Sequence, residues 1–355
     1  MRSSNSFFCL FPCWAVSFSN DLDSSDLFSL PFDEANQNLC KTIHDALLRQ
    51  DLEISTDLKI RLLKDKEEEE ISNTPPVFDE ELWQKEVLSS ETTPILKGLP
   101  KPPFYCELAK RILLLTRWQN KQNDLQLTKH RKDSVSKEKL SRSKIDYRVL
   151  IDGNNLGLTE NKSLQNLYYL PSLSSTKLTP SKLTKWLNAI GDDGIMEILG
   201  MRRTVGTKLN SLPPSINELQ NASRKPHKPN SHTTLKKNAK NSDKPLLSVG
   251  ARALSKHFHR GKTDQFFGQL KGNTNMKNES ADRIISDMIR NAVWINIHTF
   301  GGVSSYILEI RLINGYGARW SADWEDKLPY NVTNVTFRGF LEPQMEDGFE
   351  KKWRH

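Results

Sequence analysis

Apolar residues are scarce in this chain and never run together for long. They make up 36% of its 355 residues, whereas roughly 45 to 50% is typical of a globular domain. Such a chain cannot bury enough apolar surface along its whole length to offset the entropy lost on ordering, so long disordered stretches are expected. No run approaches the roughly 18 apolar residues of a membrane-spanning helix, which predicts a soluble protein without a membrane partner.

Cysteine is scarce as well. The chain has four cysteines, namely Cys9, Cys13, Cys40 and Cys106. Residues 107–355 therefore cannot contain a disulfide or a cysteine-bound zinc, and the spacings fit no paired CxxC motif. We expect a reducing compartment, the cytoplasm or the nucleus or both. A weak N-terminal targeting signal stays open, because residues 7–16 form a short apolar stretch.

Charge is divided unevenly along the chain. Residues 1–100 carry 9 Lys and Arg against 19 Asp and Glu, whereas residues 101–355 carry 42 against 24. Such asymmetry bears on partners rather than on fold. The basic two-thirds could bind RNA, another polyanion, an acidic protein or the acidic start of the same chain.

Patterning divides the chain into segments. We expect disordered chain at 1–40, short acidic helices that could form a docking region at 41–118, a basic linker at 119–144, a small ordered segment at 145–215, a basic disordered arm at 216–247 and a compact domain at 248–355.

The last segment has the clearest pattern. It contains one predicted helix at 249–260 and a second at 276–291, whose apolar residues recur on one face. Alternating residues then predict strands at 293–299, 306–313 and 335–341, with one more after the turn at 314–315. The expected fold class is α+β, with two helices packed on one face of a roughly four-stranded antiparallel sheet.

The Asn-Gly pair at 314–315 is a strong hairpin signal. A two-residue loop there would pair Arg311 with Ala318 and Glu309 with Trp320. Since side chains alternate along a strand, all four would lie on the sheet face away from the helices. On that face, substituting Arg311 should affect ligand binding and hardly change stability.

The same register places Arg319 on the helix-packed side of the sheet. An unpaired buried charge costs several kcal/mol, so we expect Arg319 to be partly buried and paired with Glu342 or Glu346, which follow the last strand.

The face away from the helices also gathers Asn296 and His298. A solvated sheet face would be polar too. Trp, His, a carboxylate and a guanidinium together are nevertheless typical of a ligand site with a general acid or base. His298 and Glu309 are the catalytic candidates, and Arg311 would hold an anion.

Basic residues cluster on the first helix of the compact domain. Arg252, Lys256, His259 and Arg260 fall within one helical face and could clamp a phosphate or carboxylate. A solvated basic face fits as well. His257 and His259 lack the i, i+4 spacing of paired helical metal ligands, so neither a metal nor another cofactor is expected.

Residues 150–156 place Asp152 at the end of a predicted strand and resemble the opening of PIN-like and NYN ribonucleases. These enzymes need several acids around a divalent cation. Asp192, Asp193 and Glu197 are the candidate partners, but the strand and helix alternation of such a fold does not follow. A strand followed by an Asn-Gly type turn explains the segment without such a site.

Longer motifs carry a second resemblance, at 249–257 (VGARALSKH), 315–320 (GYGARW), 337–348 (FRGFLEPQMEDG) and the final Trp-Arg-His. Together they resemble a protein family that ends in Gly-Trp-Arg-His, although Lys352 stands where that Gly is expected. The resemblance covers about the last 110 residues. It carries no activity to transfer.

Three functions stay open. The first is association with nucleic acid or another anion, because basic grooves with aromatic residues suit single strands. The second is an enzyme that acts on a small or nucleotide-like ligand at the polar sheet face. The third is a protein-interaction adaptor. A stripe of cations favours the first, a closed pocket around His298 and Arg311 the second, and scattered charges the third.

Overall fold

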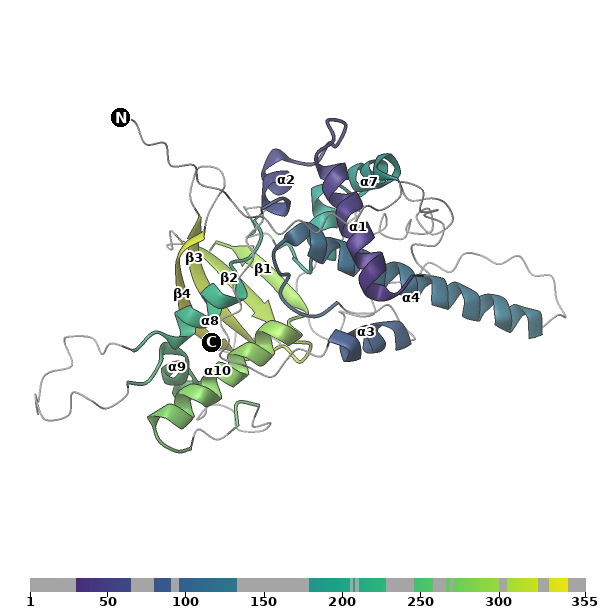
Figure 1. Cartoon of the computed structure of the whole chain (residues 1–355). Helices are drawn as coiled ribbons and strands as arrows, with labels where there is room; N and C mark the ends of the chain where they lie inside the picture. Colours follow the sequence, from purple (N-terminus) through teal and green to yellow (C-terminus); the bar gives the residue numbers. More distant parts are fainter. Residues whose placement is uncertain are drawn as a thin grey trace, which may run out of the picture.

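The computed structural model describes residues 30–64, 80–90, 96–132, 179–204, 207, 211–227, 246–257, 266–268, 271–299, 305–324 and 332–343. Their helices are α1 (Phe32–Leu47), α2 (Thr56–Leu62), α3 (Glu80–Ser89), α4 (Phe104–Lys132), α7 (Pro180–Ile198), α8 (Ile216–Arg224), α9 (Val249–His257) and α10 (Thr274–Asn291). The strands are β1 (Trp294–His298), β2 (Tyr306–Arg311), β3 (Gly317–Trp324) and β4 (Val332–Leu341). Helices α1 to α7 lie on one side of the molecule, and the sheet with α8 to α10 lies on the other (Figure 1).

The N-terminal helices pack through a shared apolar core. Helix α1 contacts α4 and α7, and Leu39 and Ile43 of α1 are fully buried in a cluster with Leu108 of α4. Helix α1 begins at Phe32, inside the segment predicted to be disordered. Acidic residues in its first turn complement the helix dipole, and its apolar residues recur every four positions. These two features explain why a helix forms there. Among the described residues, no helix has the length and apolarity to cross a membrane.

Cys40 of α1 and Cys106 of α4 form a disulfide between these helices. The absence of a CxxC motif bears only on pairs of closely spaced cysteines, whereas Cys40 and Cys106 are separated by 66 residues. The compartment stays a prediction.

Two further helices refine the expected organisation. Helix α4 extends to Lys132 and so enters the segment predicted as a basic linker. Helix α7 lies in the predicted ordered segment, where the side chain of Thr179 caps its start by accepting from the Lys182 amide. Residues 133–178, and with them Asp152, lie outside the described part of the chain.

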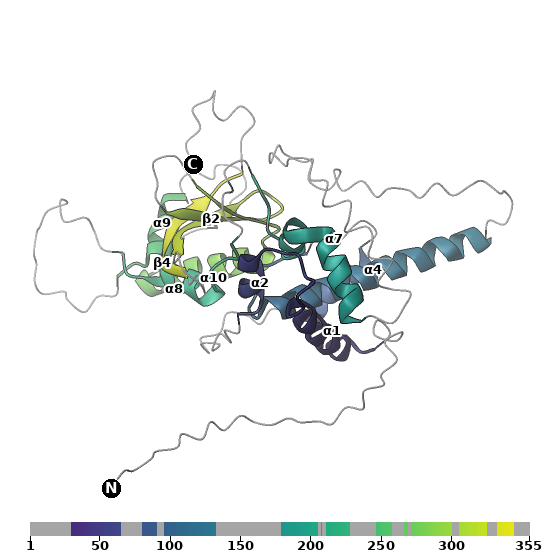
Figure 2. The same ribbon diagram turned by 90° about the horizontal axis from the view of Figure 1, so that it is seen from above.

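The fold class of the C-terminal part is confirmed as α+β. The strands form one antiparallel sheet in the order β1-β2-β3-β4. Helices α9 and α10 are the two predicted helices, and α8 is a third on the same face (Figures 1 and 2). Apolar side chains of that face, such as Leu308, Ile310 and Ala318, are fully buried under the helices.

Helix α8 lies where the sequence predicted an extended basic arm. Ser215 and Glu218 form a reciprocal capping box that begins the helix, which satisfies two otherwise unpaired backbone amides. The indole of Trp320 donates to the Leu219 carbonyl at 3.0 Å. Helix α8 is therefore part of the C-terminal core.

The predicted register of the β2–β3 hairpin is wrong by one residue. Leu312 and Tyr316 flank a three-residue loop, in which Leu312 donates to the Tyr316 carbonyl at 2.8 Å. Gly315 adopts a φ of 84°, a left-handed conformation that suits a bulged three-residue turn. Glu309 consequently lies opposite Arg319, and Trp320 turns to the helix-packed face.

The N-terminal helices attach to the sheet at two points near β1. The Arg202 amide donates to the Ile295 carbonyl at 2.6 Å, and the Gly98 amide donates to the Ala292 carbonyl at 2.8 Å. Arg111 is 1% exposed and bonds the Gly98 carbonyl at 2.9 Å. The hydrogen bond from the Gly98 amide satisfies the Ala292 carbonyl at the C-terminus of α10, which the helix itself leaves unpaired.

Candidate functional site

The face of the sheet opposite the helices carries a row of polar side chains from three strands. Asn296 of β1 lies opposite Glu309 of β2, which lies opposite Arg319 of β3. His298 and Arg311 project from the same face, two residues away along their strands. The structure therefore brings together four predicted residues, Asn296, His298, Glu309 and Arg311, and replaces Trp320 by Arg319.

Glu309 is the centre of this group and is 4% exposed. Its Oε1 accepts from Nε of Arg311 at 2.6 Å, and its Oε2 accepts from Nε of Arg319 at 2.7 Å. Nε2 of His298 lies 3.5 Å from the same Oε2. Arg319 and His298 thus converge on one carboxylate oxygen.

The environment of Glu309 decides what its carboxylate can do. Burial alone raises the pKa, but His298, Arg311 and Arg319 together outweigh burial and lower the pKa from 4.5 to about 2. Such a carboxylate stays ionised at neutral pH and is a weak base. Glu309 is thus suited to orient its cationic neighbours, whereas the sequence made it a candidate for proton transfer.

Arg311 is 1% exposed and extends over the neighbouring strand. Its Nη1 donates to the carbonyls of Gly315 at 2.7 Å and Glu342 at 3.2 Å. A Cβ at Gly317 would lie 3.0 Å from Cγ of Arg311, so a glycine there leaves room for this path. The expectation that Arg311 is dispensable for stability does not fit this burial.

Two polar atoms of this face are buried without a hydrogen-bond partner among the described residues. They are Nη2 of Arg311 and Nε1 of Trp294. Glu309 contributes one negative charge against the two guanidinium groups of Arg311 and Arg319. Within the described residues, two guanidinium groups therefore share one carboxylate in a mostly buried place.

The segment that follows α7 borders the face at β1. The Asn296 amide donates to Thr204 Oγ1 at 3.0 Å, and its carbonyl accepts from Thr207 Oγ1 at 2.8 Å. Asn296 is fully buried. Arg319, 23% exposed at its side chain, is the most accessible member of the group, so the face opens toward solvent at this guanidinium.

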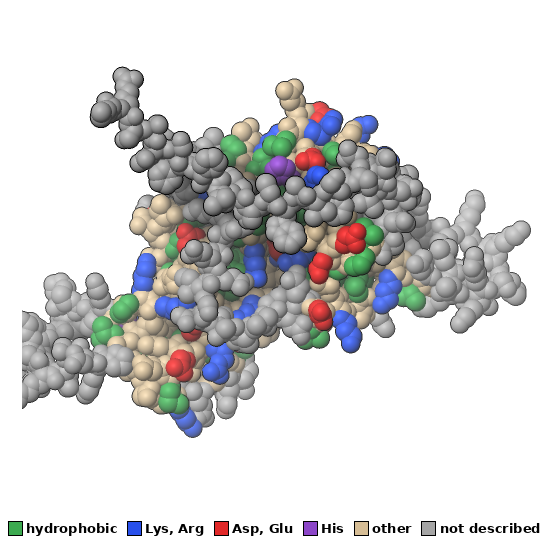
Figure 3. All heavy atoms as spheres, in the orientation of Figure 1, with side chains coloured by type: hydrophobic (Ala, Val, Ile, Leu, Met, Phe, Trp, Pro, Cys, Tyr) green, Lys and Arg blue, Asp and Glu red, His purple; other side chains and the backbone are tan. Residues whose placement is uncertain are grey.

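The predicted anion-binding residues are not gathered in one place. Arg252 and Lys256 are exposed on α9, which packs on the helix side of the sheet, whereas Arg311 lies on the other face. His259 and Arg260 lie outside the described residues, so the clamp on α9 stays a prediction. Figure 3 shows basic and acidic side chains intermingled on the helix side, with no single continuous stripe there.

Of the two predicted partners of Arg319, Glu342 is wrong and Glu346 lies outside the described residues. Arg319 pairs with Glu309, because the one-residue register shift moves it to the polar face. Glu342 instead lies 3.1 Å from Nδ1 of His257. No local pattern in the sequence relates His257 to Glu342, and only the fold brings the two side chains together.

The acids considered for a nuclease-like metal site have other roles. Asp192 accepts from the Ser55 amide at 2.9 Å, and Asp193 pairs with Arg203. Glu197 lies on the same helix, α7. No cluster of three or more His, Cys, Asp or Glu residues suited to a metal occurs in the described part of the chain.

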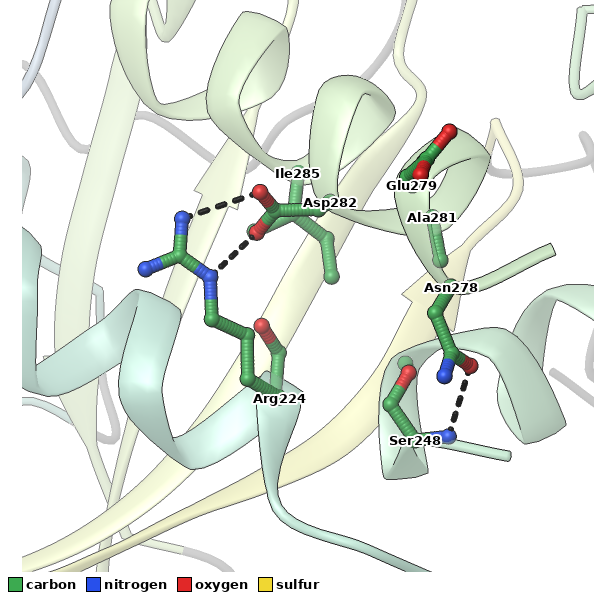
Figure 4. A pocket seen from close by; sticks show the side chains of 9 residues that line it. Arg224, Ser248, Asn278, Glu279, Ala281, Asp282 and Ile285 are labelled. Carbon is green, nitrogen blue, oxygen red and sulfur yellow. Dashed lines mark hydrogen bonds and ion pairs between the residues drawn. The ribbon is translucent and has the colours of Figure 1, made fainter. Parts of the chain in front are cut away.

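A hollow of about 280 Å³ lies among α8, α9 and α10. Figure 4 shows Arg224 paired with Asp282 across it, and Asn278 accepting from the Ser248 amide. These contacts join the three helices. None of the predicted site residues lines this hollow.

One comparison with known proteins found a match. Residues 236–342 match the family model of the CdiA C-terminal tRNase toxin domain. The matched range includes α9, α10 and all four strands and ends at Glu342. No curated protein and no solved structure matches the chain. The C-terminal part is therefore similar to that toxin domain, as expected of a family region in this place.

Proposed function

We propose that the C-terminal α+β domain binds RNA and cleaves its phosphodiester backbone at the polar face of the sheet. The observation that carries the proposal is the convergence of Arg319 and His298 on one oxygen of Glu309, at 2.7 and 3.5 Å. A phosphate held by the accessible side of Arg319 would lie beside an imidazole. The match to a tRNase toxin domain supports RNA as the substrate class.

The residues of the face divide the chemistry among them. Arg319 would hold the phosphate and stabilise the charge that develops on its oxygens. His298 would take the proton of the attacking 2′-hydroxyl, and solvent would protonate the departing 5′-oxygen. The products are a 2′,3′-cyclic phosphate and a 5′-hydroxyl. Glu309 positions both groups and stays ionised throughout.

Charge supports the same assignment. Residues 101–355 carry 42 Lys and Arg against 24 Asp and Glu, and a basic chain is attracted to the phosphate backbone irrespective of sequence. Two hypotheses from the sequence, nucleic-acid association and an enzyme at the polar sheet face, thereby become one.

Incubation of the full chain with end-labelled tRNA and single-stranded RNA tests the proposal. We expect fragments that end in a 2′,3′-cyclic phosphate. His298→Asn should slow cleavage by a factor of about 100 or more, as expected for loss of a general base, while RNA binding stays close to wild type. Arg319→Gln should weaken both.

Lys41→Gln supplies the control, because Lys41 is an exposed cation on α1, a helix that packs against α4 and α7. It should cleave as wild type does. Absence of cleavage by the wild-type chain, or unchanged cleavage by His298→Asn, would contradict the proposal.

A further inference from the structure

We propose that the edge of the C-terminal domain formed by β4 and α9 is a second RNA contact, which holds the phosphate backbone outside the polar face. The inference rests on the proposed function and adds the surface along which the RNA would continue. We call this surface the β4–α9 edge; its cations are Lys225, Arg252, Lys256 and Arg338, and all are exposed.

The packing of α9 on β4 brings Lys225, Arg252 and Lys256 to the edge strand, from whose other side Arg338 projects, next to the helix-facing Phe337. The Val249 amide at the start of α9 donates to the Lys225 carbonyl at 2.9 Å, and Nζ of Lys225 donates to the Val335 carbonyl at 3.4 Å. At the other end, the rings of His257 and Phe340 lie 6.0 Å apart. Helix α9 therefore runs beside β4, with Lys225 at one end and Lys256 at the other.

The edge has an unusual charge. Neither α9 nor β4 contains an Asp or Glu, and within the described ranges none of the four cations takes part in an ion pair. Elsewhere in the same domain, cations such as Arg224 and Arg319 are paired. Exposed cations without an acidic partner can replace the counterions of a polyanion.

The position of the edge favours a long polyanion over a small anion. It lies at the end of the sheet away from the N-terminal helices, as Figures 1 and 2 both show. Its cations come from the C-cap of α8 (Lys225), from α9 (Arg252 and Lys256) and from β4 (Arg338), and they do not converge on one point. RNA presents a phosphate at every nucleotide and can contact separated cations, whereas a single phosphate cannot.

A charge-matched pair of variants tests the inference in the full chain. In the edge variant, Lys225, Arg252, Lys256 and Arg338 become Gln. In the control variant, exposed residues outside the C-terminal domain, namely Lys41, Lys85, Lys101 and Lys185, become Gln. Both changes remove four positive charges, so a general effect of net charge is equal in the two.

The measurement is the affinity for a labelled oligouridylate by fluorescence anisotropy as salt is raised from about 50 to 200 mM. Each phosphate contact contributes about 0.7 to the slope of log affinity against log salt for single strands, so the edge variant should lower the slope by about 3. The control should change it by less than about 1. Far-UV circular dichroism checks that both variants are folded.

The outcomes separate this inference from the proposed function. Equal slopes for the edge and control variants overturn the inference, and the proposed function survives if wild-type cleavage still depends on His298. A wild-type chain that neither binds nor cleaves RNA overturns both. Polyglutamate that competes as well as RNA of equal charge would assign the edge to acidic proteins and overturn its assignment to RNA.

Discussion

Glu309→Gln should destabilise the C-terminal domain in a manner that depends on pH. In the folded protein, the pKa of Glu309 is lowered from 4.5 to about 2. A shift of this size corresponds to about 3 kcal/mol of stability when the carboxylate is ionised, at about 1.4 kcal/mol per pKa unit. Glutamine has the same shape but no charge, so it leaves Arg311 buried without its counterion.

The sign follows from proton linkage. A lowered folded-state pKa stabilises the protein above the unfolded-state pKa, and this stability is lost as pH falls toward the folded-state pKa. The difference in unfolding free energy between wild type and Glu309→Gln should therefore be about 3 kcal/mol at pH 6 and about 1 kcal/mol at pH 3.

Urea denaturation of both proteins, followed by tryptophan fluorescence across this pH range, measures the difference directly. Trp320 is fully buried in the same domain and reports its unfolding. A difference that stays constant with pH, or that is absent at pH 6, would refute the reasoning that the three cations stabilise an ionised Glu309.

Three other substitutions test the packing around the site, each by urea denaturation. Gly317→Ala should cost about 3 kcal/mol, because a Cβ there would lie 2.1 Å from the Ile310 carbonyl oxygen and overpacking is costly; a smaller loss than about 1 kcal/mol would show that β3 can shift. Trp320→Phe should cost at least about 1 kcal/mol through the lost hydrogen bond to Leu219, and wild-type stability would argue against α8 as part of the core. Burial raises the pKa of Glu197, aided by Asp193 and opposed by Arg202, from 4.5 to about 7, so ionising this carboxyl costs stability as pH rises through 7. Glu197→Gln should accordingly be more stable than wild type at pH 8, by up to about 3 kcal/mol, and nearly equal to it at about pH 4; a gain that is the same at both pH values would contradict this assignment.

Periodicity predicts most of the helices and strands of the C-terminal domain, but not α8. Apolar residues at helical spacing located α10, and alternation located β1 and β2, because each element buries one side. Periodicity does not predict helix α8, because the helix contains few apolar residues and so has no clear apolar stripe. Its capping box, Ser215 followed three residues later by Glu218, was the local signal that could have located it.

The site could be predicted only in part. His298, Glu309 and Arg311 were placed on one polar face, because alternation fixes the face of each residue within a strand. Arg319 was placed on the wrong face, since an Asn-Gly pair is compatible with a two-residue and with a bulged three-residue turn. One residue of loop length then reverses every side chain of the following strand.

Contacts between distant segments could not be predicted from the sequence. Thr204 and Asn296 are separated by 92 residues, and no local pattern relates them. The same holds for His257 and Glu342, 85 residues apart. Such pairs depend on how whole elements pack, which a single sequence does not specify by local pattern.

Photochemical cross-linking of RNA to the full chain tests the central claim most directly, because it locates the RNA without relying on a substitution. After cross-linking to labelled tRNA and digestion, mass spectrometry identifies the peptides that carry nucleotides. We expect cross-links in β1 and β3, near His298 and Arg319, and fewer of them in Arg319→Gln. Cross-links confined to α10 and the N-terminal helices, with none in these strands, would contradict the polar face of the sheet as the RNA site.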